Sequence, residues 1–290
     1  MEDIDQFQTE EDLEKIHAPN IIIDEAATAR NKELAEMLLD GILDVKMQAS
    51  AACMFENVPS FAPWDRIAEW HRPENLLYNL VDRPEFMHKI IEKITDASLA
   101  MLDQMEEKGL LSSGQGKVHC SGAYTNDLPN YSYKTENVKA KNIWTFGAAQ
   151  IFTSVSPAMH QEFELEYANR WYSRFGLVSY GCCEPLHDKI DILRKIPNLR
   201  KISMSPWVDV EKGAERIGKD FVFTGKPNPV QVAGISWDPD AARRDLRNTL
   251  EICNRYGCTT QFILKDISTV HMQPQRLWEW IDIAMELVQQ

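Results

Sequence analysis

The chain has 290 residues, 44% of them hydrophobic, and a formal net charge of −13. This length suits one α/β barrel or two smaller domains, and the acidic balance excludes a typical nucleic-acid-binding protein, which needs a basic surface. No apolar run approaches the length of a membrane span, and the acidic N-terminus is unlike a secretory signal. We therefore expect a cytoplasmic protein that binds neither nucleic acid nor membrane. Six cysteines without a CxxC pair do not indicate a disulfide framework or a ribbon-type zinc site.

The N-terminal half carries mainly helical patterns. The first 18 residues are polar, and we expect them to form a peripheral segment of a single domain that spans residues 1–290. Apolar spacing predicts helices over residues 26–39, 64–70 and 83–108. Residues 44–50 and 117–124 read as strands, and a polar loop follows at residues 125–141. A helix is expected to begin at Ser156 and Pro157, with Ser156 as its cap.

From residue 177 onward, strands and helices alternate regularly. We predict strands at residues 177–183, 200–205, 220–225 and 259–266, each followed by a helix, and this rhythm favours a parallel sheet. The last helix is expected to turn the apolar side chains of Leu277, Ile281, Met285 and Val288 inward. Small or polar residues follow each strand, at the ends where barrels and doubly wound sheets carry their sites. A GxGxxG or Walker A motif is missing from the sequence, which weakens the case for a nucleotide-binding sheet.

The richest candidate site is the stretch LVSYGCCEPLH at residues 177–187. Because side chains alternate along a strand, Tyr180, Cys182 and Glu184 are expected to share the face that points into the barrel mouth, and Cys183 to face the surrounding helices. A thiol, a carboxylate and a phenol at the end of a strand are typical active-site groups. The alternative is a pair of buried structural cysteines, since free cysteine is among the most buried residue types.

Other candidates follow the later strands. Lys226 and Lys265 are expected at partly desolvated strand ends, where either could pair with Asp266 or with an anionic substrate; a simple salt bridge is the alternative. Trp207 is a candidate wall of the pocket, although aromatic residues near strand ends are also common in cores. His119 beside a strand is more often a hydrogen-bonded structural residue than a ligand.

Several short motifs, taken in order, resemble the uroporphyrinogen decarboxylase superfamily. They are the YGCCE run at residues 180–184, the helix start at residues 156–157, the GKPNP turn at 225–229, and ILKD at 263–266 followed by QPQRL at 273–277. The resemblance covers roughly residue 82 to the C-terminus and implies a TIM-type (β/α)8 barrel. Longer members of the superfamily have an N-terminal region of which this chain lacks a part, so we expect a barrel that is incomplete at its N-terminal side.

Departures from the family pattern bear on the activity. The porphyrin decarboxylases have an arginine-rich N-terminal segment that grips carboxylates and a histidine after the last strand, where this chain has Ser268; we therefore do not expect decarboxylation of uroporphyrinogen. The zinc-dependent methylcobamide methyltransferases have a His-x-Cys pair and a second cysteine. Here Cys182 matches, Tyr180 replaces the histidine, and Ser268 or a neighbour replaces the second cysteine. A zinc ion would need other groups, and the candidates are Glu184, His119, Cys120 and Asp266.

The leading hypothesis is a methyltransferase-like enzyme that moves a methyl group between a corrinoid protein and a small acceptor, a thiol or a folate. Its expected cofactors are zinc and a corrinoid such as methylcobalamin carried by that partner, and a homodimer is among the expected assemblies. The alternatives are a lyase acting on a tetrapyrrole or small carboxylate, and a non-catalytic member that binds a corrinoid or a partner protein. The predicted site comprises catalytic Cys182, Glu184 and Asp266, metal-ligating Cys182, Glu184 and His119, and substrate-binding Tyr180, Lys226, Asn228, Lys265 and Trp207.

Overall fold

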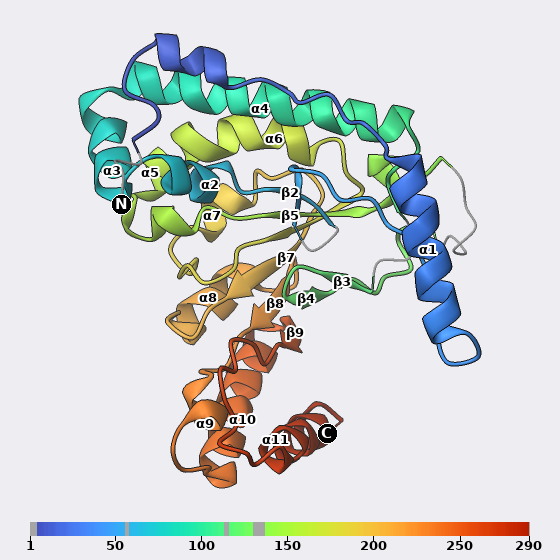
Figure 1. The fold of residues 1–290 in the computed structure, drawn as a ribbon. Coiled ribbons are helices and arrows are strands. Elements are labelled where there is room, and N and C mark those ends of the chain that lie inside the picture. The colour runs from blue at the N-terminus through green and yellow to red at the C-terminus, as the bar shows by residue number, and fades with distance from the viewer. Residues whose placement is uncertain (1–4, 56–57, 113–115, 130–136, 290) are drawn as a thin grey trace.

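The structure, a computed structural model, describes residues 5–55, 58–112, 116–129 and 137–289. Its centre is a parallel sheet of six strands that follow one another in chain order (Figure 1). The strands are β2 (Val58–Phe61), β5 (Trp144–Gly147), β6 (Leu177–Tyr180), β7 (Leu199–Met204), β8 (Val222–Gly225) and β9 (Thr259–Phe262). A two-residue strand, β1 (Met54–Phe55), pairs antiparallel with β2 at one edge. Among the described residues β9 has no strand on its other side, so the sheet is open.

The four strands predicted in the C-terminal half are present, and each pairs in parallel with the next. Three of them end earlier than expected, β6 at Tyr180, β9 at Phe262 and, by one residue, β7 at Met204. Residues 44–50, predicted as a strand, form neither helix nor strand. Residues 117–124, predicted as one strand, instead form a hairpin of β3 (Lys117–Val118) and β4 (Ser121–Gly122), because His119 takes a φ of 49° and turns the chain. Part of the predicted polar loop, residues 130–136, lies outside the described residues.

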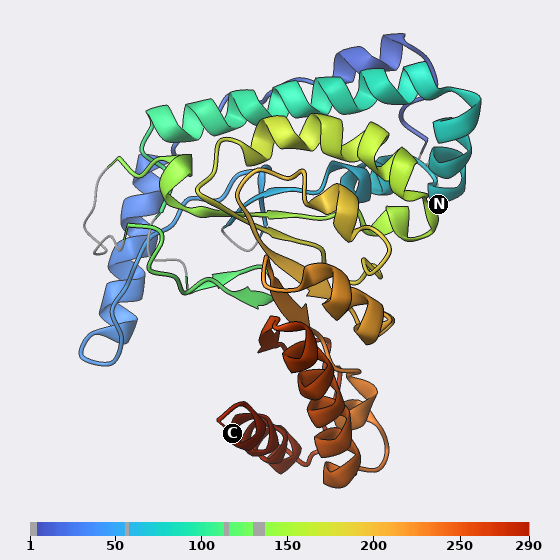
Figure 2. The same ribbon diagram turned by 180° about the vertical axis from the view of Figure 1, so that it is seen from behind.

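Most helices pack on one side of the sheet, which we call the helix side (Figures 1 and 2). The helices are α1 (Glu25–Leu39), α2 (Pro63–Trp70), α3 (Pro73–Asp82), α4 (Pro84–Glu107), α5 (Pro157–His160), α6 (Glu166–Tyr172), α7 (Ile190–Leu193), α8 (Val210–Ile217), α9 (Val230–Ala233), α10 (Pro239–Tyr256) and α11 (Gln275–Val288). Strand residues such as Val178 and Ile202 join the main core there. Trp144, Phe146 and Leu177 point to the opposite face, where Val118 of the β3–β4 hairpin packs against them. We call this face the hairpin side.

Polar side chains define where several helices begin. Asp24, Ser156, Asp209 and Asp238 each accept a hydrogen bond from the backbone N–H three residues later, which satisfies a donor that the helix itself leaves unpaired. The predicted cap at Ser156 is therefore confirmed. These local signals explain why the alternation of strands and helices could be recognised in the sequence.

The last helix, α11, packs with a different face than predicted. Its buried residues include Trp280, Ile283 and Leu287, whereas Ile281 and Met285 are exposed. Both faces of this helix are apolar, so periodicity alone cannot choose between them, and packing against α10 decides. Helix α1 has no buried residue at all and extends away from the sheet (Figure 1).

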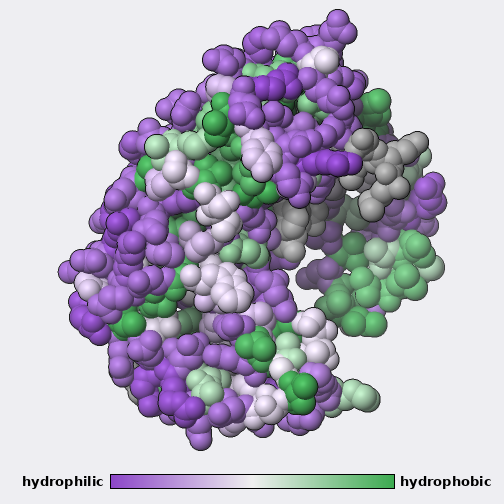
Figure 3. All heavy atoms as spheres, turned by 90° about the vertical axis from the view of Figure 1, so that its left-hand side faces the viewer, coloured by the Kyte–Doolittle hydropathy of each residue, from purple (hydrophilic) through white to green (hydrophobic). Residues whose placement is uncertain are grey.

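The surface mixes charged side chains with scattered apolar ones. Figure 3 shows a mainly hydrophilic face that is interrupted by hydrophobic patches. Exposed apolar residues lie on or just after α1 and on α11, and include Met37, Leu38, Ile42, Trp278 and Ile281. None of the described helices is both long and apolar enough to cross a membrane.

Candidate functional site

The chain turns sharply just after β6. Gly181 has a φ of +93°, a conformation that side-chain-bearing residues rarely adopt, and its N–H donates to the carbonyl of Gly147 (2.7 Å). A Cβ at Gly181 would lie 2.4 Å from Leu186 Cδ1. This turn breaks the strand alternation, so Tyr180 and Cys182 lie on opposite sides of the sheet.

Tyr180 therefore does not point toward the predicted mouth. Its side chain is fully buried on the helix side, and its hydroxyl hydrogen-bonds to His160 Nε2 at 2.7 Å. Burial, followed by the nearby Glu164 carboxylate, raises the pKa of Tyr180 well above its usual value. The prediction that Tyr180 shares a face with Cys182 is wrong, because it assumed that the strand continues through Gly181.

The backbone of Cys182 is held from both ends. Its N–H donates to Glu184 Oε2 (2.8 Å), and its carbonyl accepts from Ser203 Oγ (3.0 Å) and from Lys226 Nζ (2.8 Å). Glu184 is buried, and this burial raises the pKa of its carboxyl group. Two of the predicted site residues, Glu184 and Lys226, thus fix the position of a third, with Ser203 as a partner that the sequence did not reveal.

Three metal-ligand side chains meet on the hairpin side. Cys182 Sγ lies 3.0 Å from His119 Nε2, and one donor atom from each of His119, Cys120 and Cys182 falls within 4.8 Å of the others. The β3–β4 hairpin carries the first two, and the His119 ring packs against Phe146 with centroids 4.2 Å apart. We call these three residues the thiol–imidazole cluster.

Two lysines make this cluster electropositive. Lys265 Nζ lies 3.3 Å from Cys182 Sγ, and Lys226 is buried nearby. A hydrogen bond from Cys182 is the largest cause that lowers the pKa of Cys120 to about 6, and both lysines add to it. The same hydrogen bond and burial raise the pKa of Cys182 to about 11. The hydrogen bond between the two thiols therefore favours the thiolate form of Cys120 and the protonated form of Cys182.

The remaining predicted residues lie at the edge of this arrangement. Cys183 is exposed and lies 3.2 Å from Lys265 Nζ, so the prediction that it faces the helices is wrong. Asp266 takes a φ of 59° and pairs with Lys265 at 3.1 Å, its side chain 61% exposed. The Asn228 side chain accepts from the N–H of Val230 within its own turn. The Trp207 side chain is mostly exposed.

The structure thus joins Cys182, His119, Lys226 and Lys265 in one place, together with Cys120, one of the candidate zinc ligands named from the sequence. Glu184 is not part of the thiol–imidazole cluster, because its carboxylate faces the Cys182 backbone instead. The only sequence signal for Cys120 was its position next to His119. Its place beside Cys182 depends on how the hairpin folds over the sheet.

Neither a scan against models of protein families nor a comparison with curated proteins finds a match for this sequence. The chemistry of the cluster and of its surroundings is therefore the basis for a functional assignment.

Proposed function

We propose that this chain is a methyltransferase-like enzyme that moves a methyl group between a corrinoid protein and a small acceptor, with zinc held by His119, Cys120 and Cys182. The convergence of these three donors at the carboxyl end of β6 is the observation that carries the proposal. In parallel α/β sheets this is the end where active sites lie.

The donor set fits zinc. One imidazole and two sulfurs are ligands that zinc prefers, and catalytic zinc sites keep three protein ligands and leave a further position open. When bound, zinc would lower the pKa of a thiol acceptor by stabilising its thiolate. Metal ligation requires the thiolate form. The pKa of Cys120 is already lowered, whereas Cys182, whose pKa is raised, would release its proton when the metal binds.

The cluster also accounts for the departures from the family pattern. Cys182 stands where the resembling methyltransferases have a cysteine ligand, but Tyr180 stands in place of their histidine. We infer that His119 and Cys120, from the β3–β4 hairpin, substitute for the two missing ligands. The inferred site keeps one histidine and two cysteines as ligands, but the histidine and one of the cysteines come from the hairpin.

We further propose that the sheet is part of a TIM-type barrel. Its six parallel strands follow chain order without the reversal that defines a doubly wound sheet. The sheet has a helix side and a hairpin side, and the polar groups on the hairpin side also fit the inner face of a barrel wall. Lys201 of β7, for example, donates to Ser121 of the hairpin on that side (3.4 Å).

Within this proposal, the chain's own residues hold the acceptor and stabilise its negative charge. Lys265 would stabilise an anionic sulfur beside Cys182, since its ammonium already lies 3.3 Å from that thiol. Lys226 and Glu184 position Cys182 through its carbonyl and N–H. The acceptor thiol would lose its proton to solvent, and its sulfur would then form a bond to the methyl carbon while the donor's cobalt–carbon bond breaks and its electron pair stays with the partner's corrinoid.

Metal analysis combined with an activity assay tests the proposal. We expect purified protein to retain about one zinc per chain, and to transfer methyl groups from methylcobalamin to at least one member of a panel of thiols and folates. Removal of the metal with a chelator should abolish transfer, and added zinc should restore it. Failure to bind zinc at micromolar concentrations, or transfer that chelation leaves unchanged, would contradict the proposal.

A further inference from the structure

A second feature of the molecule is a cavity of about 560 Å³ between the N-terminal segment and the sheet. Its walls come from residues 6–19, from α2 and α4, and from the ends of β2 and β5. This volume is within the range of small-molecule sites. Large apolar side chains make up much of its lining: Phe7, Phe61, Trp70, Ile94, Met101 and Phe146.

The charged side chains on its wall already have partners. Lys15 pairs with Asp12 at 2.7 Å, and Arg66 pairs with Glu69 at 3.3 Å. The Asp65 carboxylate accepts hydrogen bonds from the segment that follows β5, one backbone and one side chain. The four charged side chains of the lining, Lys15, Asp65, Arg66 and Glu69, sum to zero charge, so a carboxylate or phosphate on a ligand gains no net attraction. The lining therefore favours an uncharged, mainly apolar ligand.

The cavity leads to the thiol–imidazole cluster. His119 and Phe146 line it, and both also border a small void next to Cys120 and Lys226. His119 also contacts the cluster directly, because its Nε2 lies 3.0 Å from Cys182 Sγ. A molecule in the cavity could thus place one end beside His119, the member of the cluster that lines it.

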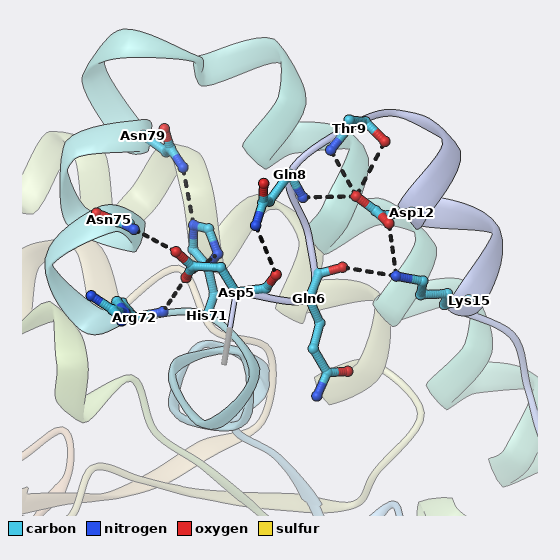
Figure 4. A network of polar contacts seen from close by, with 10 residues as sticks. All are labelled: Asp5, Gln6, Gln8, Thr9, Asp12, Lys15, His71, Arg72, Asn75 and Asn79. Carbon is cyan, nitrogen blue, oxygen red and sulfur yellow. Dashed lines mark hydrogen bonds and ion pairs between the residues drawn. The ribbon is translucent and has the colours of Figure 1, made fainter. Parts of the chain in front are cut away.

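The N-terminal segment closes the outer wall and is held at both ends. Near its start, Asp5 accepts from the N–H of Arg72 (2.7 Å) and from Asn75 (2.6 Å) and lies 3.1 Å from His71 Nδ1 (Figure 4). At its far end, Gln104 of α4 donates to the carbonyl of Pro19 (3.0 Å). The cover is therefore an ordered part of the cavity.

We propose that this cavity binds the body of the methyl acceptor, and that the acceptor is an uncharged, largely apolar thiol. The assignment as an acceptor rests on the proposed function, whereas the apolar ligand site rests on the cavity alone. Such a ligand would bury its apolar body among Phe61, Ile94 and Met101 and present its sulfur near His119.

Three probes separate the parts of this proposal. Toluene tests binding to the cavity alone. Phenylmethanethiol tests binding to the cavity and the cluster together, and 3-mercaptopropionate is a thiol whose body is charged instead of apolar. By calorimetric titration of the zinc-loaded protein, we expect phenylmethanethiol to bind at least about tenfold more tightly than 3-mercaptopropionate. Equal or tighter binding of 3-mercaptopropionate would overturn the proposal.

A variant that fills the cavity provides the decisive comparison. Ala97 of α4 lines the cavity, whereas Ala100, one turn away, is exposed and does not. Ala97→Phe should weaken both toluene and phenylmethanethiol at least about tenfold, because the new ring occupies their space. Ala100→Phe should leave both affinities unchanged, and zinc content should match the wild type in both variants.

Melting curves establish that each variant is folded, and Ala97→Leu serves as a smaller filling substitution if Ala97→Phe is not. Unchanged toluene affinity in a folded Ala97 variant, or no toluene binding to the wild type, would overturn the cavity assignment. Toluene binding that is lost in the Ala97 variant, in a protein that neither binds zinc nor transfers methyl groups, would leave the apolar site standing and refute the proposed function instead.

Discussion

Two polar clusters lie on opposite sides of the sheet at the end of β6, and they differ in access. On the helix side, Tyr180 bonds to His160 (2.7 Å) and Tyr172 donates to Glu164 (3.2 Å), and all four side chains are fully buried. On the hairpin side, His119 and Cys120 are only partly buried. Tyr180 belongs to the first cluster and Cys182 to the second, and these two residues are only two positions apart in the chain.

The electrostatic environments differ in the same way. Burial raises the pKa values of Tyr180 and Tyr172, so both hydroxyl groups stay neutral and serve as hydrogen-bond partners. On the hairpin side, the hydrogen bond from Cys182 and the charges of two lysines lower the pKa of Cys120. A perturbed group that solvent can reach suits chemistry, whereas a perturbed group sealed in a core suits structure. The comparison teaches that titratable residues alone do not mark a site; access decides.

The largest expected effect comes from removing a ligand on the hairpin side. Cys182→Ala should weaken zinc binding at least about 1000-fold, roughly a third of a binding free energy on the order of 12 kcal/mol. The matched control is Cys183→Ala, because Cys183 is exposed and is not one of the three converging donors, although its Sγ lies 3.5 Å from that of Cys182. A competition titration with a zinc-binding dye measures both. Equal loss in the two variants would remove the distinction between these neighbouring cysteines.

The turn that separates the two clusters can be broken directly. Gly181→Ala should destabilise the protein by about 3 kcal/mol, because the new Cβ meets Leu186 and the backbone has a positive φ. Gly41→Ala is the control, since Gly41 also has a positive φ but nothing within 4 Å of the new Cβ; it should cost about 1 kcal/mol. Urea unfolding measures both. Similar costs at the two positions would show that packing around Gly181 does not hold the turn.

A change confined to the helix side should affect stability but not metal binding. Tyr180→Phe removes the hydroxyl that bonds to His160 and should cost about 1.5 kcal/mol, the usual range for leaving a buried polar group without its partner. Tyr78→Phe, at an exposed position on α3, should cost close to nothing. A loss of zinc affinity in the Tyr180 variant would mean that the two clusters are coupled.

The smallest expected effect sharpens the comparison through pH. In metal-free protein, alkylation of Cys120 by iodoacetamide should reach half its maximum near pH 6. At pH 7 its rate should exceed that of an ordinary thiol only about twofold, because a less basic thiolate is also less nucleophilic. Lys265→Ala should move the midpoint upward, since it removes a charge that favours the thiolate. A midpoint near 8.5, the ordinary value for cysteine, would contradict the described electrostatics.

The same shift has a consequence for stability. The pKa of Cys120 is lower in the folded chain than in the unfolded one, so the thiolate contributes stability that is fully present above the ordinary cysteine pKa. That contribution declines as the pH falls and is lost below about pH 6. The thermal midpoint of the metal-free protein should therefore fall more steeply over this interval than that of a Cys120→Ala variant.

Local rules in the sequence were sufficient for much of the fold. The alternation of apolar strands and helices after residue 177 predicted four parallel strands, and Ser156 marked a helix start where the structure has one. The run of residues 177–187 also placed Cys182 at the end of a strand. These features depend on hydrogen bonds and side-chain patterns within a few residues of each other, so they can be recognised from the chain alone.

Tertiary structure decided the rest. Strand alternation predicted that Tyr180 and Cys182 lie on the same face of the sheet. Cys182 lies on the opposite face instead, because the chain turns at Gly181 with a positive φ that glycine allows. The buried face of α11 followed from its packing on α10 rather than from its own pattern. His119 and Cys120 meet Cys182 from about 60 positions away, since a hairpin that packs on the sheet brings them there. Contacts between residues so far apart in the chain depend on how the whole core packs, and no single segment of the sequence specifies that packing.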